Sequence, residues 1–75
     1  MMNKKFEEKF LNVIKKNLLV KKRITMEDDV KSFQKWDSLN NIRILVDLNK
    51  TFKKNININK IGNIKTLKDL GKYFL

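Results

Sequence analysis

The chain of 75 residues contains neither cysteine nor histidine. Without cysteine it has no disulfide framework and no thiol nucleophile, and cysteine usage reveals nothing of its redox compartment. Without histidine as well, it lacks the two commonest ligands of transition metals and the side chain best suited to general base catalysis near neutral pH. We therefore expect no metal site, no catalytic residue and no enzyme activity of its own.

Proline, internal repeats and long apolar runs are also absent. No apolar stretch approaches the roughly 20 residues needed to cross a bilayer. Glu7 and Glu8, and then Lys15 and Lys16, interrupt the apolar residues near the N-terminus, so no signal-peptide core forms. A chain of this length buries only about 60% of its unfolded surface. The sequence predicts one small domain over residues 1–75, without a deep cleft, located in the cytoplasm and not inserted in a membrane.

Acidic residues are few: 8 Asp and Glu stand against 18 Lys and Arg, giving a net charge of +10. Such a balance ordinarily indicates nucleic acid or an anionic membrane surface as the partner. However, all but two of the basic residues are lysines spread among asparagines and isoleucines, and no basic helix face carries interleaved aromatic residues. We expect no specific nucleic-acid surface, and a small basic helical domain that binds nucleic acid or an acidic protein remains the alternative function.

Hydrophobic periodicity predicts a first helix over residues 3–19, where apolar residues recur at steps of three and four. Residues 20–35 predict a long loop with isolated apolar anchors at Ile24, Val30 and Phe33. Within this loop Thr25 and Asp28 have the spacing of a capping box, which predicts one short helical turn with acidic residues at its positive end. A solvated acidic patch over residues 27–29 is the alternative.

A second helix is predicted over residues 38–53. One face carries the core stripe Ile44, Leu45, Leu48 and Phe52. An adjoining stripe consists of Leu39, Ile42 and Val46, so the apolar arc is wider than packing on one side requires. Either a ligand or partner covers this second stripe, or a further helix of the chain does.

The C-terminal part alternates asparagine and isoleucine from residue 55 onward, but a lone strand has nothing to pair with in a helical chain. We therefore expect a loop with a short helix over residues 58–61, which Gly62 ends in the left-handed conformation. The last helix begins at its cap Thr66, with Asp69 three residues later, and buries Leu67, Leu70 and Phe74. The predicted fold class is all-α.

The most informative segment is Trp36-Asp37-Ser38-Leu39, which lies where polar sequence gives way to the second helix. Asp37 is suited to cap the helix by accepting an amide proton, which leaves the Ser38 hydroxyl exposed in the first turn. The Asp-Ser-Leu triplet in the middle of the chain, followed by Phe52, Ile56 and the Ile64-Lys65-Thr66-Leu67 start of the last helix, resembles the acyl carrier protein family. Alternatively, Ser38 is only a favoured first-turn residue.

The resemblance implies a four-helix bundle with a long loop between helices 1 and 2 and a short third helix. A phosphopantetheinyl transferase would attach a 4'-phosphopantetheine arm to Ser38, with Asp37 and Leu39 beside the attachment point. The arm would carry an acyl or aminoacyl group as a thioester to loading and transfer enzymes. The protein would be a monomeric phosphoprotein of fatty acid or secondary metabolite biosynthesis.

Other positions take their expected roles from the same resemblance. Leu39, Ile42, Val46 and Ile61 match positions that flank the arm or face partner enzymes, and Ile44, Leu48, Phe52 and Ile56 match the family's core. Each of the first four is alternatively an ordinary core residue. Trp36 is expected to cover the base of the arm or to contact a partner, or else to be a partly buried anchor.

The chain also departs from the family. Gln34-Lys35 stands where the family often has Leu-Gly, and the usually acidic second helix offers Asn40, Arg43, Asn49 and Lys50, with only Asp37 and Asp47 as acids. Like charges across an interface weaken binding, so we expect dedicated partners with neutral or acidic docking faces, in a specialised pathway. A carrier-like fold that has lost its modification and serves as an assembly subunit is a further possibility.

Overall fold

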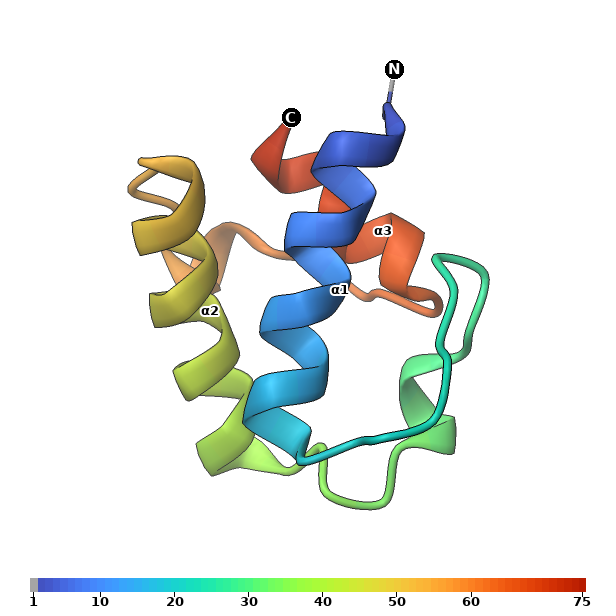
Figure 1. Ribbon diagram of the computed structural model, residues 1–75. Helices are drawn as coiled ribbons and strands as arrows, with labels where there is room; N and C mark the ends of the chain where they lie inside the picture. The colour runs from blue at the N-terminus through green and yellow to red at the C-terminus, as the bar shows by residue number, and fades with distance from the viewer. Residues whose placement is uncertain (1) are drawn as a thin grey trace.

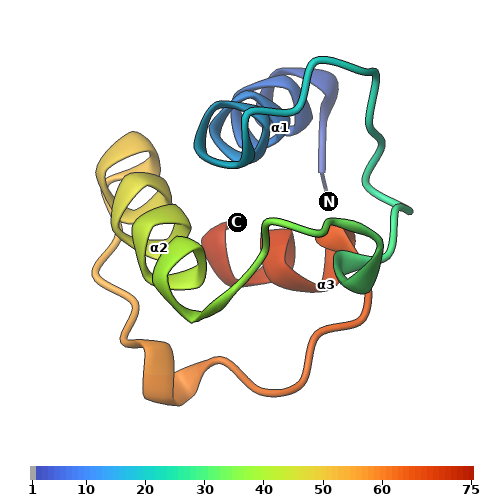
Figure 2. The ribbon, with the colours of Figure 1, turned by 90° about the horizontal axis from the view of Figure 1, so that it is seen from below.

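The computed structural model describes residues 2–75, which form three α-helices and three single 3-10 turns (Figures 1 and 2). In chain order these are α1 (Lys4–Leu18), η1 (Val30–Ser32), α2 (Ser38–Phe52), η2 (Ile58–Lys60), α3 (Leu67–Gly71) and η3 (Lys72–Phe74). No β-strand occurs in this part of the chain, whose one β contact is an isolated bridge between Asp29 and Thr66. The all-α class is confirmed, and so is the rejection of a strand in the asparagine-rich segment.

Helix α1 follows directly from its sequence pattern. Asn3 caps it, because its side-chain oxygen accepts a hydrogen bond of 2.8 Å from the amide of Phe6. The periodic apolar residues Phe10, Val13, Ile14 and Leu18 are buried. The helix ends at Leu19, which takes the left-handed conformation with φ 54° and is 72% exposed.

Helices α1 and α2 lie side by side, and η3, which continues α3, packs against α2 (Figure 2). Asp47 on α2 fastens the pair from outside, since it accepts a hydrogen bond of 2.9 Å from Asn17 and lies 3.0 Å from the ammonium of Lys16. At the opposite end of the α1–α2 pair, the ring centroid of Phe52 lies 4.7 Å from that of Phe6 and 6.2 Å from that of Phe74.

The segment between α1 and α2 is built into the core. Ile24 and Phe33 are buried and Val30 is half-buried, as expected of anchors, and Met26 is a fourth, buried anchor that the periodicity did not indicate. The segment also provides acceptors for the orphan amides at the start of α3: Leu67 donates to the carbonyl of Asp28 at 3.0 Å, and Lys68 to that of Met26 at 2.8 Å. These two bonds join parts of the chain that are far apart in sequence.

The acidic run in this segment consists largely of turn caps. The carboxylate of Asp28 accepts a hydrogen bond of 2.9 Å from the amide of Thr25, and the amide of Asp28 donates one of 3.1 Å to the carbonyl of Thr25. A single turn is therefore present where one was predicted, but it is not helical. Asp29 instead caps η1, by accepting from the amide of Lys31 at 2.8 Å. Glu27 is exposed. The cap and solvated-patch interpretations therefore each hold for part of the run.

The chain after α2 is held by one asparagine. The side chain of Asn49 donates to the carbonyl of Ile56 at 3.0 Å and accepts from its amide at 2.9 Å. These two hydrogen bonds, called the clamp below, hold the chain after α2 against the side of that helix as it runs toward η2. The segment predicted as a short third helix is the single 3-10 turn Ile58–Lys60, capped by Asn57.

The prediction that Gly62 ends this turn in the left-handed conformation is wrong. Neither glycine has a positive φ, and the turn ends at Ile61 in extended backbone. The amide of Ile61 caps the turn by donating to the carbonyl of Ile58, and the amide of Gly62 donates to the hydroxyl of Tyr73 at 3.0 Å. Further on, the capping box of Thr66 and Asp69 is confirmed.

Lys53, which ends α2, offers a test of the backbone account. It is exposed and left-handed with φ 53°. This conformation is energetically unfavourable for every residue that carries a Cβ atom. We predict that Lys53→Gly raises the free energy of unfolding by about 1 kcal/mol, as measured by urea denaturation. Lys54→Gly removes the same charge at an exposed neighbour without a positive φ and should be neutral or destabilising; equal effects of the two changes would contradict the account.

Candidate functional site

Ser38 is the first residue of α2 and is exposed. Asp37 caps the helix as predicted, because its Oδ1 accepts a hydrogen bond of 2.8 Å from the amide of Asn40. The amides of Ser38 and Leu39 have no acceptor within residues 2–75. The hydroxyl of Ser38 therefore lies beside two free N–H donors at the positive end of a helix of 15 residues, where a negative group is favoured.

The only other serine makes a useful contrast. Ser32, in η1, is also exposed, but its hydroxyl donates a hydrogen bond of 2.6 Å to the carbonyl of Asp29. No such bond engages the Ser38 hydroxyl within the described part of the chain. Of the two serine oxygens, that of Ser38 is the more available for modification.

Trp36 is half-buried two positions before Ser38. Its indole N–H donates to the side-chain oxygen of Asn41 at 3.0 Å, and its ring centroid lies 6.1 Å from that of Phe33. Trp36 also lines an open hollow beside Ser38, of about 370 Å³. It is thus both a partly buried anchor and a wall of the space next to the serine. Val30 and Ile64, from segments distant in sequence, complete the hollow. Its full lining is Val30, Trp36, Asp37, Ser38, Asn41 and Ile64.

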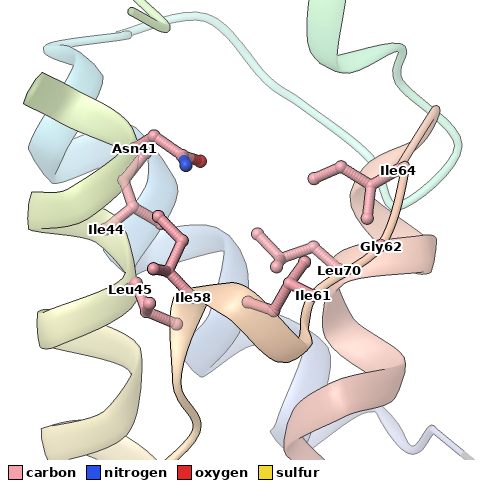
Figure 3. Close-up of a pocket in the computed structure, with 8 residues that line it drawn as sticks. All are labelled: Asn41, Ile44, Leu45, Ile58, Ile61, Gly62, Ile64 and Leu70. Carbon is pink, nitrogen blue, oxygen red and sulfur yellow. The ribbon is translucent and has the colours of Figure 1, made fainter. Parts of the chain in front are cut away.

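A more enclosed pocket of about 110 Å³ lies between α2 and the segment that carries η2 (Figure 3). Its lining is almost entirely aliphatic and comprises Asn41, Ile44, Leu45, Ile58, Ile61, Gly62, Ile64 and Leu70. Asn41 and Ile64 line both this pocket and the hollow beside Ser38. The hollow beside Ser38 therefore adjoins this aliphatic pocket.

The residues expected to flank the arm or face partners separate into two groups. Ile61 is half-buried in the pocket between α2 and η2. Leu39, Ile42 and Val46 are 59%, 52% and 52% exposed, and none of the helices described for residues 2–75 covers them. The second apolar stripe of α2 is therefore open to solvent, as the ligand-or-partner interpretation requires, and Arg43 lies exposed beside it.

Three polar residues expected on the docking face of α2 are engaged within the chain. Asn40 donates to the carbonyl of Lys35 at 2.7 Å, Asn49 forms the clamp on Ile56, and Asp47 binds α1. Burial alone would raise the pKa of Asp47, but hydrogen bonds from Asn17 and Lys16 and the Lys16 charge lower it. Asp37 is exposed as well but serves as the helix cap, and the other exposed charges on this face are those of Arg43 and Lys50.

Sequence reasoning missed Asn41, Ile58 and Ile64 as parts of the site. The spacing of Ile58, Ile61 and Ile64 at steps of three was the available signal, but it belongs to no regular helix. Their position depends on the clamp of Asn49 and on the pairing of residues near Val30 with those near Lys65. Neither contact has a sequence signature.

Comparisons with protein-family models, with curated proteins and with solved structures found no match for this chain. Among residues 2–75, no cluster of three or more His, Cys, Asp or Glu side chains could hold a metal ion. No helix in the same range has the length and apolar character needed to span a membrane.

The lowered pKa of Asp47 predicts a pH dependence of stability. A carboxylate whose pKa is depressed by folding stabilises the fold above its unfolded pKa, and this contribution is lost as pH falls through the folded pKa. Relative to Asp47→Asn, the wild-type chain should be more stable by up to about 1 kcal/mol at neutral pH. The difference should begin to shrink as pH falls toward the ordinary pKa of 3.8 and vanish only below the lowered pKa of the folded state, as urea denaturation across the acid range would measure. Glu8→Gln, at an exposed site, is the control; an equal effect there would contradict the assignment.

Proposed function

We propose that this chain is a carrier protein whose Ser38 bears a 4'-phosphopantetheine arm. The arm's thiol holds an acyl or aminoacyl group as a thioester and presents it to enzymes of a specialised biosynthetic pathway. The observation that carries the proposal is an exposed, capped first-turn serine beside an open hollow that adjoins an apolar pocket. The resemblance of the Asp-Ser-Leu triplet and its surroundings to acyl carrier proteins points to the same chemistry.

The attachment step needs an accessible alcohol and a catalyst from outside. A phosphopantetheinyl transferase would form the bond between the Ser38 oxygen and the phosphorus of the pantetheine phosphate of coenzyme A. The phosphoanhydride bond breaks, the nucleotide leaves, and a base of the transferase takes the serine proton. The free amides of Ser38 and Leu39 are placed to donate to the new phosphodiester, which the helix dipole also stabilises.

The pocket next to the hollow favours a small apolar cargo. At about 110 Å³ it is smaller than the roughly 150 Å³ apolar cavity that accommodates benzene in an engineered protein. Its wall contains one polar side chain, that of Asn41, whose oxygen accepts the indole proton of Trp36. A short acyl or aliphatic aminoacyl group would fit this lining better than a long chain or a charged group.

The finer features of the proposal follow from this role. In this role the 3-10 turn η2 would stand for the short third helix of a four-helix carrier bundle, and the segment between α1 and α2 for its long loop. The protein would act as a monomer in the cytoplasm, as a substrate of its transferase and of acyl- or aminoacyl-loading and transfer enzymes. The high positive charge supports a second candidate, a small basic domain that binds nucleic acid or an acidic protein without modification.

The proposal predicts a covalent modification that mass spectrometry can detect. After incubation with coenzyme A, magnesium and a broad-specificity phosphopantetheinyl transferase, intact mass should increase by one phosphopantetheine group. Ser38→Ala should abolish the increase. Ser32→Ala should retain it, because the Ser32 hydroxyl is bound to the carbonyl of Asp29 and is not the proposed attachment site.

The alternatives give different results in the same experiment. No mass increase with several transferases would refute the carrier function. A steep fall of DNA affinity with salt, combined with the absence of modification, would favour the basic binding domain. Modification that persists in Ser38→Ala would locate the acceptor elsewhere and contradict the assignment of the site.

A further inference from the structure

The outer face of α2 carries three large aliphatic side chains that none of residues 2–75 covers. Leu39, Ile42 and Val46 follow one another at steps of three and four, so they share one side of the helix, and each is more than half exposed. Ile42 and Val46 form part of a shallow groove of about 430 Å³ where α2 runs beside the end of α1. A contiguous exposed apolar strip in a small protein marks an interaction surface.

Cations dominate the rim of this groove. Lys16 from α1 and Arg43 and Lys50 from α2 line it, together with a single carboxylate, Asp47. That carboxylate is held by α1, since Asn17 donates to its Oδ2 at 2.9 Å and the Lys16 ammonium lies 3.0 Å from the same oxygen. Asp47 therefore completes the α1–α2 fastening and leaves the groove with an excess of positive charge.

We propose that this groove docks an acidic amphipathic helix of a partner protein. An aliphatic side chain of the partner would lie on Ile42 and Val46, and its Asp or Glu side chains would face Arg43 and Lys50. The identification of the partner as an enzyme that uses the arm rests on the proposed carrier function. The groove's preference for an acidic helix does not, because Ser38 is not among its lining residues.

Two other anionic occupants match the groove less well. Single-stranded nucleic acid is bound by aromatic side chains on which bases stack, and no aromatic residue lines this groove. A membrane surface is broad and nearly flat, so it contacts an apolar face that protrudes, whereas Ile42 and Val46 line a groove. A helix with one apolar ridge matches both the shape and the charge.

The test uses the full, unmodified chain and a synthetic helical peptide of about 16 residues, with a leucine stripe flanked by glutamates. Fluorescence anisotropy should show binding that weakens as salt rises from about 0.05 to about 0.3 M. A matched peptide with lysine in place of glutamate should not bind. Val46→Asn should weaken binding about fivefold through loss of apolar contact. Lys50→Glu should weaken it about tenfold through charge reversal.

Lys68→Glu on α3 is the matched control, because it makes the same change in net charge at an exposed position that does not line the groove. It should weaken binding less than twofold. No binding of the acidic peptide, an equal loss for Lys50→Glu and Lys68→Glu, or no effect of Val46→Asn would overturn the proposal. Tighter binding of an oligothymidine or of vesicles of phosphatidylserine and phosphatidylcholine would also overturn it. Because the protein is unmodified throughout, these outcomes are independent of whether Ser38 accepts an arm.

Discussion

The hydrogen bond from the amide of Asn40 to the carboxylate of Asp37 determines where α2 begins, and the candidate site depends on that position. With Asp37 as cap, Ser38 becomes the first helical residue, and its amide and that of Leu39 stay free. The apolar pattern of the same helix places Ile44, Leu45 and Leu48 in the core and leaves Ile42 and Val46 outside. The cap thus sets the environment of the serine, and the apolar pattern of α2 sets the surface proposed for a partner.

The space beside Ser38 depends on contacts between distant parts of the chain. Val30 and Ile64 face the serine's hollow from segments that lie on either side of α2 in sequence. They are held together because the amide of Val30 donates to the carbonyl of Lys65 at 2.8 Å, and because the first amides of α3 donate to the carbonyls of Asp28 and Met26. The irregular segments of this small protein therefore contribute to its core and to its candidate site, which compensates for the few helical residues available to be buried.

Local signals made much of the fold predictable. The caps Asp37 and Thr66 and the periodic apolar residues of α1 and α2 act within a few residues, so sequence spacing reveals them. The failures concern contacts without such spacing. Gly62 was expected to be left-handed, but its amide binds the hydroxyl of Tyr73, and the buried anchor Met26 lies outside any periodic pattern. The pocket near Ile61 could not be foreseen for the same reason, since the clamp between Asn49 and Ile56 positions the segment that forms it.

The account is tested most directly by the amide resonances of isotope-labelled protein before and after treatment with transferase and coenzyme A. A phosphodiester on Ser38 should shift the amides of Ser38 and Leu39 and the indole resonance of Trp36, while the capped amide of Asn40 moves less. An unchanged spectrum, or changes centred away from the start of α2, would contradict the claim that this serine is the tether.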